Sequence, residues 1–418
     1  MSGQMKLGSF LMPTGHHIAA WRHPDAVADA GLNLAHMIEL ARIAERGLFD
    51  MVFFEDAAGV REARVELASQ TSRSIGFEPI SLLAALAANT RNIGLVATAS
   101  TSYNEPYALA RAFATLDLVS NGRAGWNLVT SASEIEAANF GAHGLRAHGD
   151  RYVRANEFAE TVAILWEPSS RFGTIDHQGE NFAVGQGLGI LASPQGKPIM
   201  VQAGASDVGR DLAARTADVV FVAAQTLKDA KSFYDDVKAR TEQAGRSRDA
   251  VRILPGVSPV VAETRAEAQE KFDELQALIP DDVGLALLAS YLSTNALDGL
   301  PLDGPLPDIK AGEGMQSRQQ LVIDQSRRDG LSIRQVAQHF AGARGHWRLV
   351  GTASDVADEM EAWFRGGGCD GFNVLAAYFP GELVNFVDRV IPELQRRGLF
   401  RTAYEGTTLR ANLGLAQA

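Results

Sequence analysis

The stretch 92–131 constrains the fold more than any other part of this chain, because it places a strand, a helix and a second strand in immediate succession. Residues 93–97 are almost wholly apolar, as expected of a strand that is covered on both faces in a parallel sheet. Pro106 opens a helix, Asn121-Gly122 ends it, and a strand at 124–129 follows at once. The pattern predicts two parallel strands joined by a helical crossover.

Small polar residues follow both of these strands. Thr98 comes directly after the first strand, and Thr130 and Ser131 come directly after the second. The carboxyl ends of parallel strands are where α/β folds place their chemistry. We therefore expect this unit to form part of the rim of an active site.

The same alternation of strands and helices repeats along the chain. A helix capped by Asn33 ends at Gly47, and further helices separate the later strands. The other strands are expected at 49–54, 199–202, 219–223, 253–261 and 371–376. About seven or eight βα units are visible, and right-handed crossovers make a closed (β/α)8 TIM barrel the economical α/β fold. We expect residues 1–418 to form a single domain.

The chain of 418 residues exceeds the usual length of such a barrel. We assign the excess to insertions in rim loops at about 134–147, 168–196 and 280–348, which are rich in Gly, Pro or polar residues. Rim insertions commonly form lids or substrate walls. For the last of the three, a surface used for subunit contacts is an equally weighted alternative.

Composition limits the functional classes. The net charge of −11, without a long basic run, argues against nucleic acid or an anionic membrane as a partner. No apolar run approaches the length of a membrane span, and residues 1–10 lack the apolar stretch of a secretory signal. Cys369 is the only cysteine, so neither an intramolecular disulfide nor a cysteine-built metal site is expected. We expect a cytoplasmic protein.

The segment 202–210 follows a strand and opens a helix. Its small residues and the Ser206 hydroxyl would present donors to an anion such as a phosphate. It matches neither GxGxxG nor GxxxxGK, so a Rossmann or Walker site is not indicated. An ordinary helix N-cap is the alternative for Ser206. Similarly, Asp56 after the strand at 49–54 could hold a polar ligand group or only cap a turn.

His148 and Tyr152 lie one helical turn apart at the start of a helix, so both could project towards the rim. The alternative is that Asp150 caps this helix while Tyr152 only packs. His16-His17 and His23 invite a metal assignment, but the chain has no HExxH pattern, and we expect no metal.

Short pieces of the chain resemble the bacterial-luciferase-like flavin monooxygenases. The resemblance is to the branch that contains nitrilotriacetate monooxygenase component A, dibenzothiophene-sulfone monooxygenase, dimethyl sulfide monooxygenase and long-chain alkane monooxygenase. The matching pieces extend in the same order from about residue 7 to residue 401. They are Phe10-Leu11-Met12, Trp21-Arg22-His23-Pro24, Gly47-Leu48-Phe49-Asp50, Glu105-Pro106-Tyr107, Thr115-Leu116-Asp117, Asn121-Gly122-Arg123, Trp126-Asn127-Leu128-Val129-Thr130-Ser131, Asn139-Phe140-Gly141, Asp150-Arg151-Tyr152, Gln202-Ala203-Gly204 and Pro392-Glu393-Leu394-Gln395-Arg396-Arg397-Gly398.

The resemblance implies a (β/α)8 barrel with insertions that binds FMN at the carboxyl end of its strands. The phosphate site of the family matches Ala205 and Ser206. Positions around the flavin match Asp56, Thr98, Ser131, His148 and Tyr152. Candidates for the walls of the substrate pocket are Phe10, Tyr103 and Trp126, each with plain core packing as an equal alternative. Trp126 and Asn127 alternate along their strand, so only one of them faces the barrel interior.

The resemblance also implies the chemistry. Reduced FMN (FMNH2) would come from a separate NAD(P)H:flavin reductase, and O2 would add to it to give a peroxyflavin that oxidises a small organic substrate. This chain would be the oxygenase component of that two-component system. His148 and Ser131 are the candidate catalytic residues, because they could steady the peroxide or exchange a proton. Family substrates include organosulfur compounds and aminopolycarboxylates.

Alkane-oxidising members carry a histidine in the insertion that corresponds to residues 280–348, where this chain has Leu288-Ala289-Ser290-Tyr291. This departure disfavours an alkane substrate. Two other functions stay open: a deazaflavin (F420)-dependent oxidoreductase on the same fold, and a flavin-binding barrel without turnover. We expect a homodimer or homotetramer.

Overall fold

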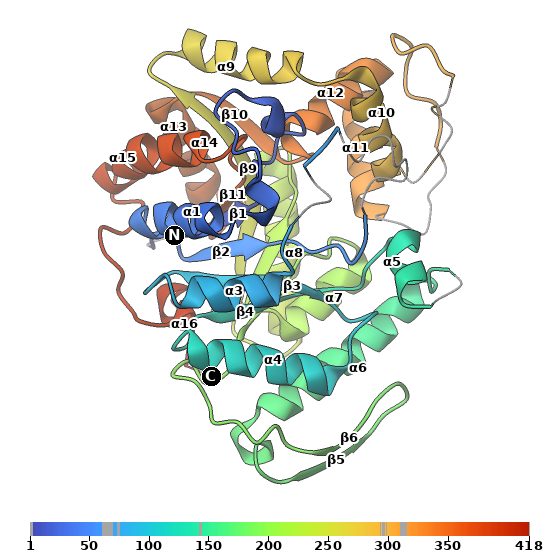
Figure 1. The fold of residues 1–418 in the computed structure, drawn as a ribbon, viewed down its shortest axis with the longest axis vertical. Coiled ribbons are helices and arrows are strands. Elements are labelled where there is room, and N and C mark those ends of the chain that lie inside the picture. The colour runs from blue at the N-terminus through green and yellow to red at the C-terminus, as the bar shows by residue number, and fades with distance from the viewer. Residues whose placement is uncertain are drawn as a thin grey trace.

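The computed structural model describes residues 3–60, 70–72, 76–141, 144–292, 294, 297, 299–309 and 316–417. Its centre is a closed barrel of eight parallel strands with helices around it, as predicted (Figure 1). In order around the barrel, the strands are β1 (Lys6–Leu11), β2 (Met51–Phe54), β3 (Gly94–Ser100), β4 (Ala124–Val129), β7 (Ile199–Gln202), β8 (Val219–Val222), β9 (Arg252–Ala262) and β11 (Gly371–Val374). The barrel closes because β11 pairs with both β9 and β1.

Local signals explain where most of the outer helices begin. Asn33 caps the first of them by accepting a hydrogen bond from the His36 N–H, and prolines open two others. The helices of the outer layer are α1 (Leu34–Arg46), α3 (Pro79–Ala87), α4 (Pro106–Val119), α6 (His148–Trp166), α7 (Asp207–Thr216), α8 (Leu227–Gln243), α9 (Arg265–Ala277) and α13 (Ala353–Arg365). Three short helices complete the C-terminal part, namely α14 (Gly381–Asn385), α15 (Ile391–Arg396) and α16 (Leu409–Asn412).

A ninth strand, β10 (Trp347–Thr352), was not predicted. It pairs in parallel with the second half of β9, outside the closed barrel. Trp347 stacks on Trp363 of α13 with ring centroids 4.0 Å apart, which anchors the strand to the helix layer. The strand lies at the end of a segment expected to be an insertion, so its short alternating pattern gave a weak signal.

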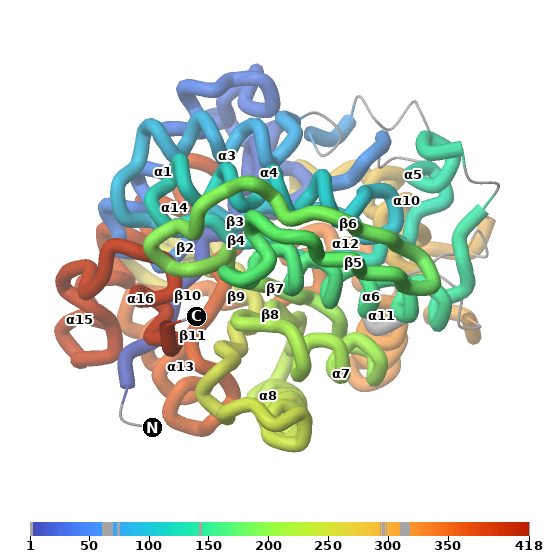
Figure 2. The backbone as a smooth tube through the Cα atoms, turned by 90° about the horizontal axis from the view of Figure 1, so that it is seen from below, coloured from blue at the N-terminus to red at the C-terminus, as the bar shows by residue number. Residues whose placement is uncertain are grey.

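The insertion at 168–196 does not lie in a rim loop, and that expectation is wrong for this segment. It follows α6 and precedes β7, so it starts from the amino-terminal end of the barrel, where Gln195 donates to the Ala124 oxygen at 2.9 Å. Its hairpin, β5 (Thr174–Gln178) and β6 (Ala183–Gln186), lies outside α4 and α6 (Figures 1 and 2). A Gly-rich polar composition predicts a loop, but it does not reveal at which end of the barrel the loop begins.

The other two insertions lie at the carboxyl end of the barrel. Residues 134–147 follow β4 and include α5 (Glu134–Asn139). The long insertion contains α10 (Asp281–Leu292), α11 (Gln316–Asp329) and α12 (Ile333–Ala343), which share a hydrophobic core of their own. Its last helix reaches the rim, because the Ala341 oxygen accepts from the Ile18 N–H at 3.0 Å after β1. In Figure 1 these helices lie on the side of the barrel opposite the chain termini.

Within the described part of the chain, no single helix is long and apolar enough to cross a membrane. The pair α9 and α10 passes that test together by length and composition only, and it is bent by 88° at the break between the helices.

Candidate active site

Phe10 lies in the barrel interior at the carboxyl end of β1. Its ring is 4.8 Å from that of Phe53 on β2 and 5.7 Å from that of Phe221 on β8, measured between centroids. Phe53 and Phe221 are themselves 5.6 Å apart, so the three rings close the interior. Phe10 therefore forms part of the apolar floor beneath the barrel mouth, which is compatible with the predicted pocket wall.

Thr98 and Asn127 point into the barrel from the neighbouring strands β3 and β4. The Thr98 hydroxyl donates to the Phe54 backbone oxygen at 2.8 Å and accepts from Asn127 Nδ2 at 2.8 Å. Asn127 Oδ1 is buried and has no hydrogen-bond partner in the described part of the chain. Because buried amide oxygens are normally paired, this oxygen is available to a polar ligand at the mouth.

Trp126 lies on the other face of β4 and points into the helix layer. Its ring is 5.7 Å from Phe158 and 6.3 Å from Trp166, both on α6, and the side chain is fully buried. Its Nε1 donates to the Ala99 oxygen at 3.0 Å. The prediction that Trp126 lines the substrate pocket is therefore wrong. Side chains alternate along a strand, and Asn127 holds the interior position.

Ser131 has a φ of +41°, close to the left-handed region that few residues other than glycine adopt. Its hydroxyl donates to the Ser100 hydroxyl at 2.8 Å, and its backbone oxygen accepts from Arg151 Nη1 at 2.9 Å. The rim after β4 is thus held to both the rim after β3 and the start of α6. Unusual backbone conformations of this kind cluster at ligand sites, where surrounding contacts maintain them.

His148 and Tyr152 meet at the entrance of α6, with ring centroids 5.0 Å apart and planes tilted by 49°. His148 is half-buried and Tyr152 is buried. A Cβ placed on Gly204 or Gly209 would come 3.0 Å from the Tyr152 hydroxyl oxygen. The structure therefore brings the entrance of α6 against the turn that follows β7.

The turn after β7 keeps its backbone accessible. Gln202 Oε1 accepts from the Gly204 N–H at 2.7 Å, and a Cβ on Gly204 would lie 2.5 Å from Gln202 Nε2. Ala205 follows half-buried, and Ser206 caps α7 by accepting from the Gly209 N–H at 3.3 Å. Because the first N–H groups of a helix have no partner within it, this turn presents donors that an anion could use.

Asp56 and Tyr103 lie at the outer edge of the rim. Asp56 comes soon after β2, and its side chain is exposed. Tyr103 stacks on Phe140, which directly follows α5, with ring centroids 4.7 Å apart and planes within 4° of parallel. Both residues flank the mouth, so their expected roles as a flavin contact and a pocket wall stay predictions.

A group of charged residues on the β1–β2 side of the mouth was not predicted from the sequence. Glu55, Arg318, Arg344 and His346 meet there, and we call these four residues the mouth cluster. Arg344 Nη2 lies 3.0 Å from Glu55 Oε2. Burial opposes the charge of Arg344, but Glu55 and Tyr291 together outweigh burial and raise the pKa of the Arg344 guanidinium. The only local sign of this cluster in the sequence was the short polar segment Arg344-Gly345-His346, near the end of the insertion at 280–348.

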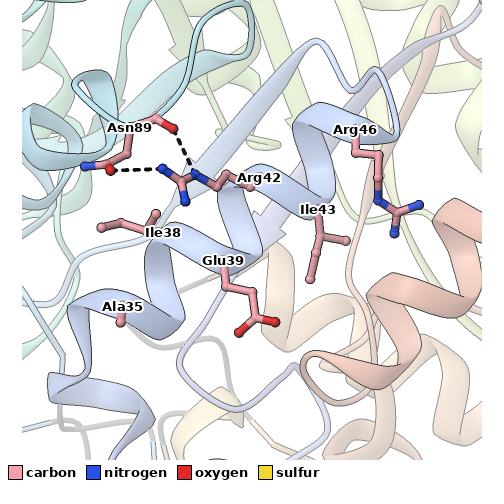
Figure 3. Close-up of a pocket in the computed structure, with 7 residues that line it drawn as sticks. All are labelled: Ala35, Ile38, Glu39, Arg42, Ile43, Arg46 and Asn89. Atoms are coloured by element: carbon pink, nitrogen blue, oxygen red, sulfur yellow. Dashed lines mark hydrogen bonds between the residues drawn. The ribbon is translucent and has the colours of Figure 1, made fainter.

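A pocket on the outer surface of the barrel lies apart from this mouth (Figure 3). It extends along α1, where Arg42 donates to the backbone oxygen and Oδ1 of Asn89, both at 3.2 Å. None of the predicted site residues lines it. We therefore place the candidate active site at the carboxyl ends of the strands.

Fold and site together define a TIM barrel whose rim carries the polar turn at Gly204–Ser206 before α7. Residues 6–370 match the family model of the luciferase-like monooxygenases, so the chain belongs to that family. It is 45% identical to nitrilotriacetate monooxygenase component A of Aminobacter aminovorans, covering 99% of this chain and 97% of the relative. It is 37% identical to dibenzothiophene-sulfone monooxygenase of Rhodococcus erythropolis, again covering 99% of this chain and 97% of the relative.

Among solved structures, DmoA from Hyphomicrobium sulfonivorans superimposes with a TM-score of 0.89 at 29% identity, over 98% of this chain and 92% of that one. These likenesses confirm the predicted family and barrel. They also confirm the predicted enzyme class, a flavin-dependent monooxygenase, over the deazaflavin alternative.

Proposed function

We propose that this chain is the oxygenase component of a two-component system that uses FMNH2 and O2 to oxidise a small organic substrate. The observation that carries the proposal is the accessible turn at Gly204–Ser206, packed against Tyr152 at the carboxyl end of the barrel. Full-length similarity to monooxygenases, one of them named as a component A, supports it.

The residues present fit FMN. A phosphate would accept hydrogen bonds from the N–H groups at Ala205 and from the Ser206 hydroxyl, at the positive end of the α7 dipole. A side chain at Gly204 would block this approach. The polar ring system would lie towards Thr98 and Ser131, where the unpaired Asn127 Oδ1 is an acceptor for a ring N–H.

Bound FMNH2 would supply the activation of O2, which protein side chains cannot perform. The protein's own task is to orient the flavin and the substrate and to exclude water from them. Phe10 supplies apolar surface that helps to exclude water from the flavin and the substrate. His148 is placed to exchange a proton through an imidazole nitrogen, and Ser131 to donate a hydrogen bond from its hydroxyl.

A separate NAD(P)H:flavin reductase is the expected partner, in keeping with the similarity to a component A. A homodimer or homotetramer located in the cytoplasm completes the proposal. Substrates of the organosulfur or aminopolycarboxylate kind are the starting point for a screen.

Rapid mixing tests the proposal. Anaerobic protein with FMNH2 is mixed with oxygenated buffer, and flavin absorbance is followed. We expect a long-lived absorbing species that is neither reduced nor oxidised FMN, and a substrate should shorten its lifetime. Reoxidation at the rate of free FMNH2 would contradict the proposal.

The His148→Ala variant separates the catalytic role from cofactor binding. Because the proposed role of His148 is proton exchange during oxidation of the substrate, we expect turnover to fall more than flavin affinity. A loss confined to flavin affinity would make His148 a cofactor contact instead.

A further inference from the structure

Arg344 lies directly over the floor of the barrel mouth. It follows α12 with a φ of +54°, and its guanidinium carbon is 5.9 Å from the centroid of the Phe10 ring. Nη2 donates to Glu55 Oε2 at 3.0 Å, and Nη1 lies 3.1 Å from Met12 Sδ. Nε is buried and has no hydrogen-bond partner in the described part of the chain. The side chain is 12% exposed, so it still reaches the mouth.

Arg318 brings a second guanidinium to the same place. Its Nη1 donates to the backbone oxygen of Arg344, and its guanidinium carbon lies 5.7 Å from the centroid of the Tyr291 ring. Gly345 makes this approach possible, because a Cβ there would come 2.9 Å from Arg318 Nη1 and the residue has a φ of +76°. Among the carboxylates that the structure describes, none forms an ion pair with Arg318.

The mouth cluster therefore holds two guanidinium groups and one carboxylate. His346 does not change this balance, because burial and the nearby Arg318 hold its pKa well below the usual value and keep it neutral. Its Nδ1 is buried and, in the described part of the chain, unpaired. An excess positive charge that is partly removed from water is costly unless an anion accompanies it.

We infer that the mouth cluster binds a carboxylate group of the organic substrate, with Arg318 as the main contact and Arg344, whose charge Glu55 partly offsets, as the second guanidinium. The inference rests on the proposed function and names its substrate class as carboxylate-bearing compounds. A guanidinium matches a carboxylate through two parallel N–H donors. The turn at Ser206 serves the other anion, because β7 lies four strands from β1 in the order around the barrel.

Binding of simple carboxylates to the full-length protein tests this inference. Isothermal titration is run at low salt with propane-1,2,3-tricarboxylate and succinate, and with uncharged succinamide as the matched probe. We expect both carboxylates to bind and succinamide not to bind. Arg318→Gln should weaken carboxylate binding on the order of tenfold or more, and Arg318→Lys should restore part of it.

Arg327→Gln is the matched control, since Arg327 is on the same helix but pairs at 2.7 Å with the exposed Asp308. It should leave carboxylate binding unchanged. If Arg318→Gln does not fold, Glu55→Gln gives a second test, because removal of the one carboxylate should tighten binding. Equal binding of succinate and succinamide, no binding of either carboxylate, or wild-type affinity in Arg318→Gln would overturn the inference.

FMN binding, measured on the same proteins, keeps the two proposals apart. Carboxylate binding without FMN binding would refute the proposed function and leave the anion site standing. FMN binding without carboxylate binding would refute the inference alone.

Discussion

The two ends of strand β2 carry the same chemical pair in different surroundings. At the amino end, Asp50 pairs with Arg401, and the two side chains are 0% and 3% exposed. At the carboxyl end, Glu55 pairs with Arg344, and the two side chains are 21% and 12% exposed. An arginine–carboxylate pair therefore does not by itself indicate a functional site. The two pairs differ in how completely the surrounding chain covers them.

The C-terminal segment closes the amino end. The Asn412 backbone oxygen accepts from Arg401 Nη2 at 2.8 Å and from Lys6 Nζ at 2.7 Å, so the second cation there has an acceptor from the protein itself. Asp50 also accepts from the Leu7 N–H at 2.7 Å. In the described part of the chain, the pair at the carboxyl end is covered less completely and stays partly exposed. We conclude that the first pair stabilises the barrel and the second is available to a ligand.

The largest effect is expected from Asp50→Ala. It would leave Arg401 buried without its carboxylate, which should lower the free energy of unfolding by about 3–5 kcal/mol. Urea unfolding followed by circular dichroism measures it. Glu55→Gln is the matched variant at the other end of β2 and should lower the free energy of unfolding by less than Asp50→Ala does, because the Glu55–Arg344 pair is partly exposed. Equal costs for the two variants would break the comparison.

The next largest effect is a pH-dependent change in the free energy of unfolding. It arises at Asp117, which accepts from the Ala124 N–H at the amino-terminal end of the barrel. Burial raises the pKa of Asp117 from 3.8 to about 6, although Ser193 and Gln195 donate to its carboxylate. Because the pKa is higher in the folded state, protonated Asp117 stabilises the fold at low pH. The free energy of unfolding should fall by about 3 kcal/mol as the pH rises through about 4 to 6.

The Asp117→Asn variant isolates this contribution, because its amide does not titrate. We expect its stability relative to the wild type to increase between about pH 4 and pH 7, by up to about 3 kcal/mol, in urea unfolding at several pH values. A difference that is independent of pH would show that Asp117 does not titrate in this window.

Ser206→Ala acts at the carboxyl end and should affect binding more than folding. Loss of a charge-assisted hydrogen bond to the phosphate should weaken FMN binding by about 1–3 kcal/mol. Ser206→Gly is the control for the helix cap, since glycine costs α7 only a few tenths of a kcal/mol. Both variants should bind FMN more weakly in a fluorescence titration. Unchanged affinity in both would remove Ser206 from the site.

The smallest effect is expected outside both ends, at the pocket in Figure 3. Arg42→Ala removes two exposed hydrogen bonds to Asn89 and should change the free energy of unfolding by no more than about 0.5 kcal/mol. FMN and carboxylate affinities should both stay at the wild-type value. A weaker affinity for either would connect that pocket with the active site.

Much of the barrel could be predicted from the sequence because its signals are local. The strands expected at 124–129 and 199–202 have those bounds in the structure, and the helix capped by Asn33 ends at Arg46, one residue before Gly47. The candidate rim residue Ser131 was found because its hydroxyl follows a strand, whereas Thr98 lies within β3, which continues to Ser100 beyond the predicted end at residue 97. Each of these features depends on neighbours within one turn or one strand.

Other features depended on contacts between distant residues. Trp126 could have faced either side of β4, and only its contacts with α6 show that it points outward and Asn127 inward. The mouth cluster joins residues as far apart as Glu55 and Arg344, which lie in segments predicted as a strand end and an insertion. Sequence spacing carries no information on such a pairing.

The sequence by itself determined the alternation of strands and helices, the barrel class and the family, since periodicity, capping residues and ordered motifs are properties of the chain. The tertiary structure alone decided which strand faces point inward, at which barrel end each insertion lies, and which charges meet. The physical reason is that burial, and with it the balance of charge at the mouth, exists only after the chain has closed.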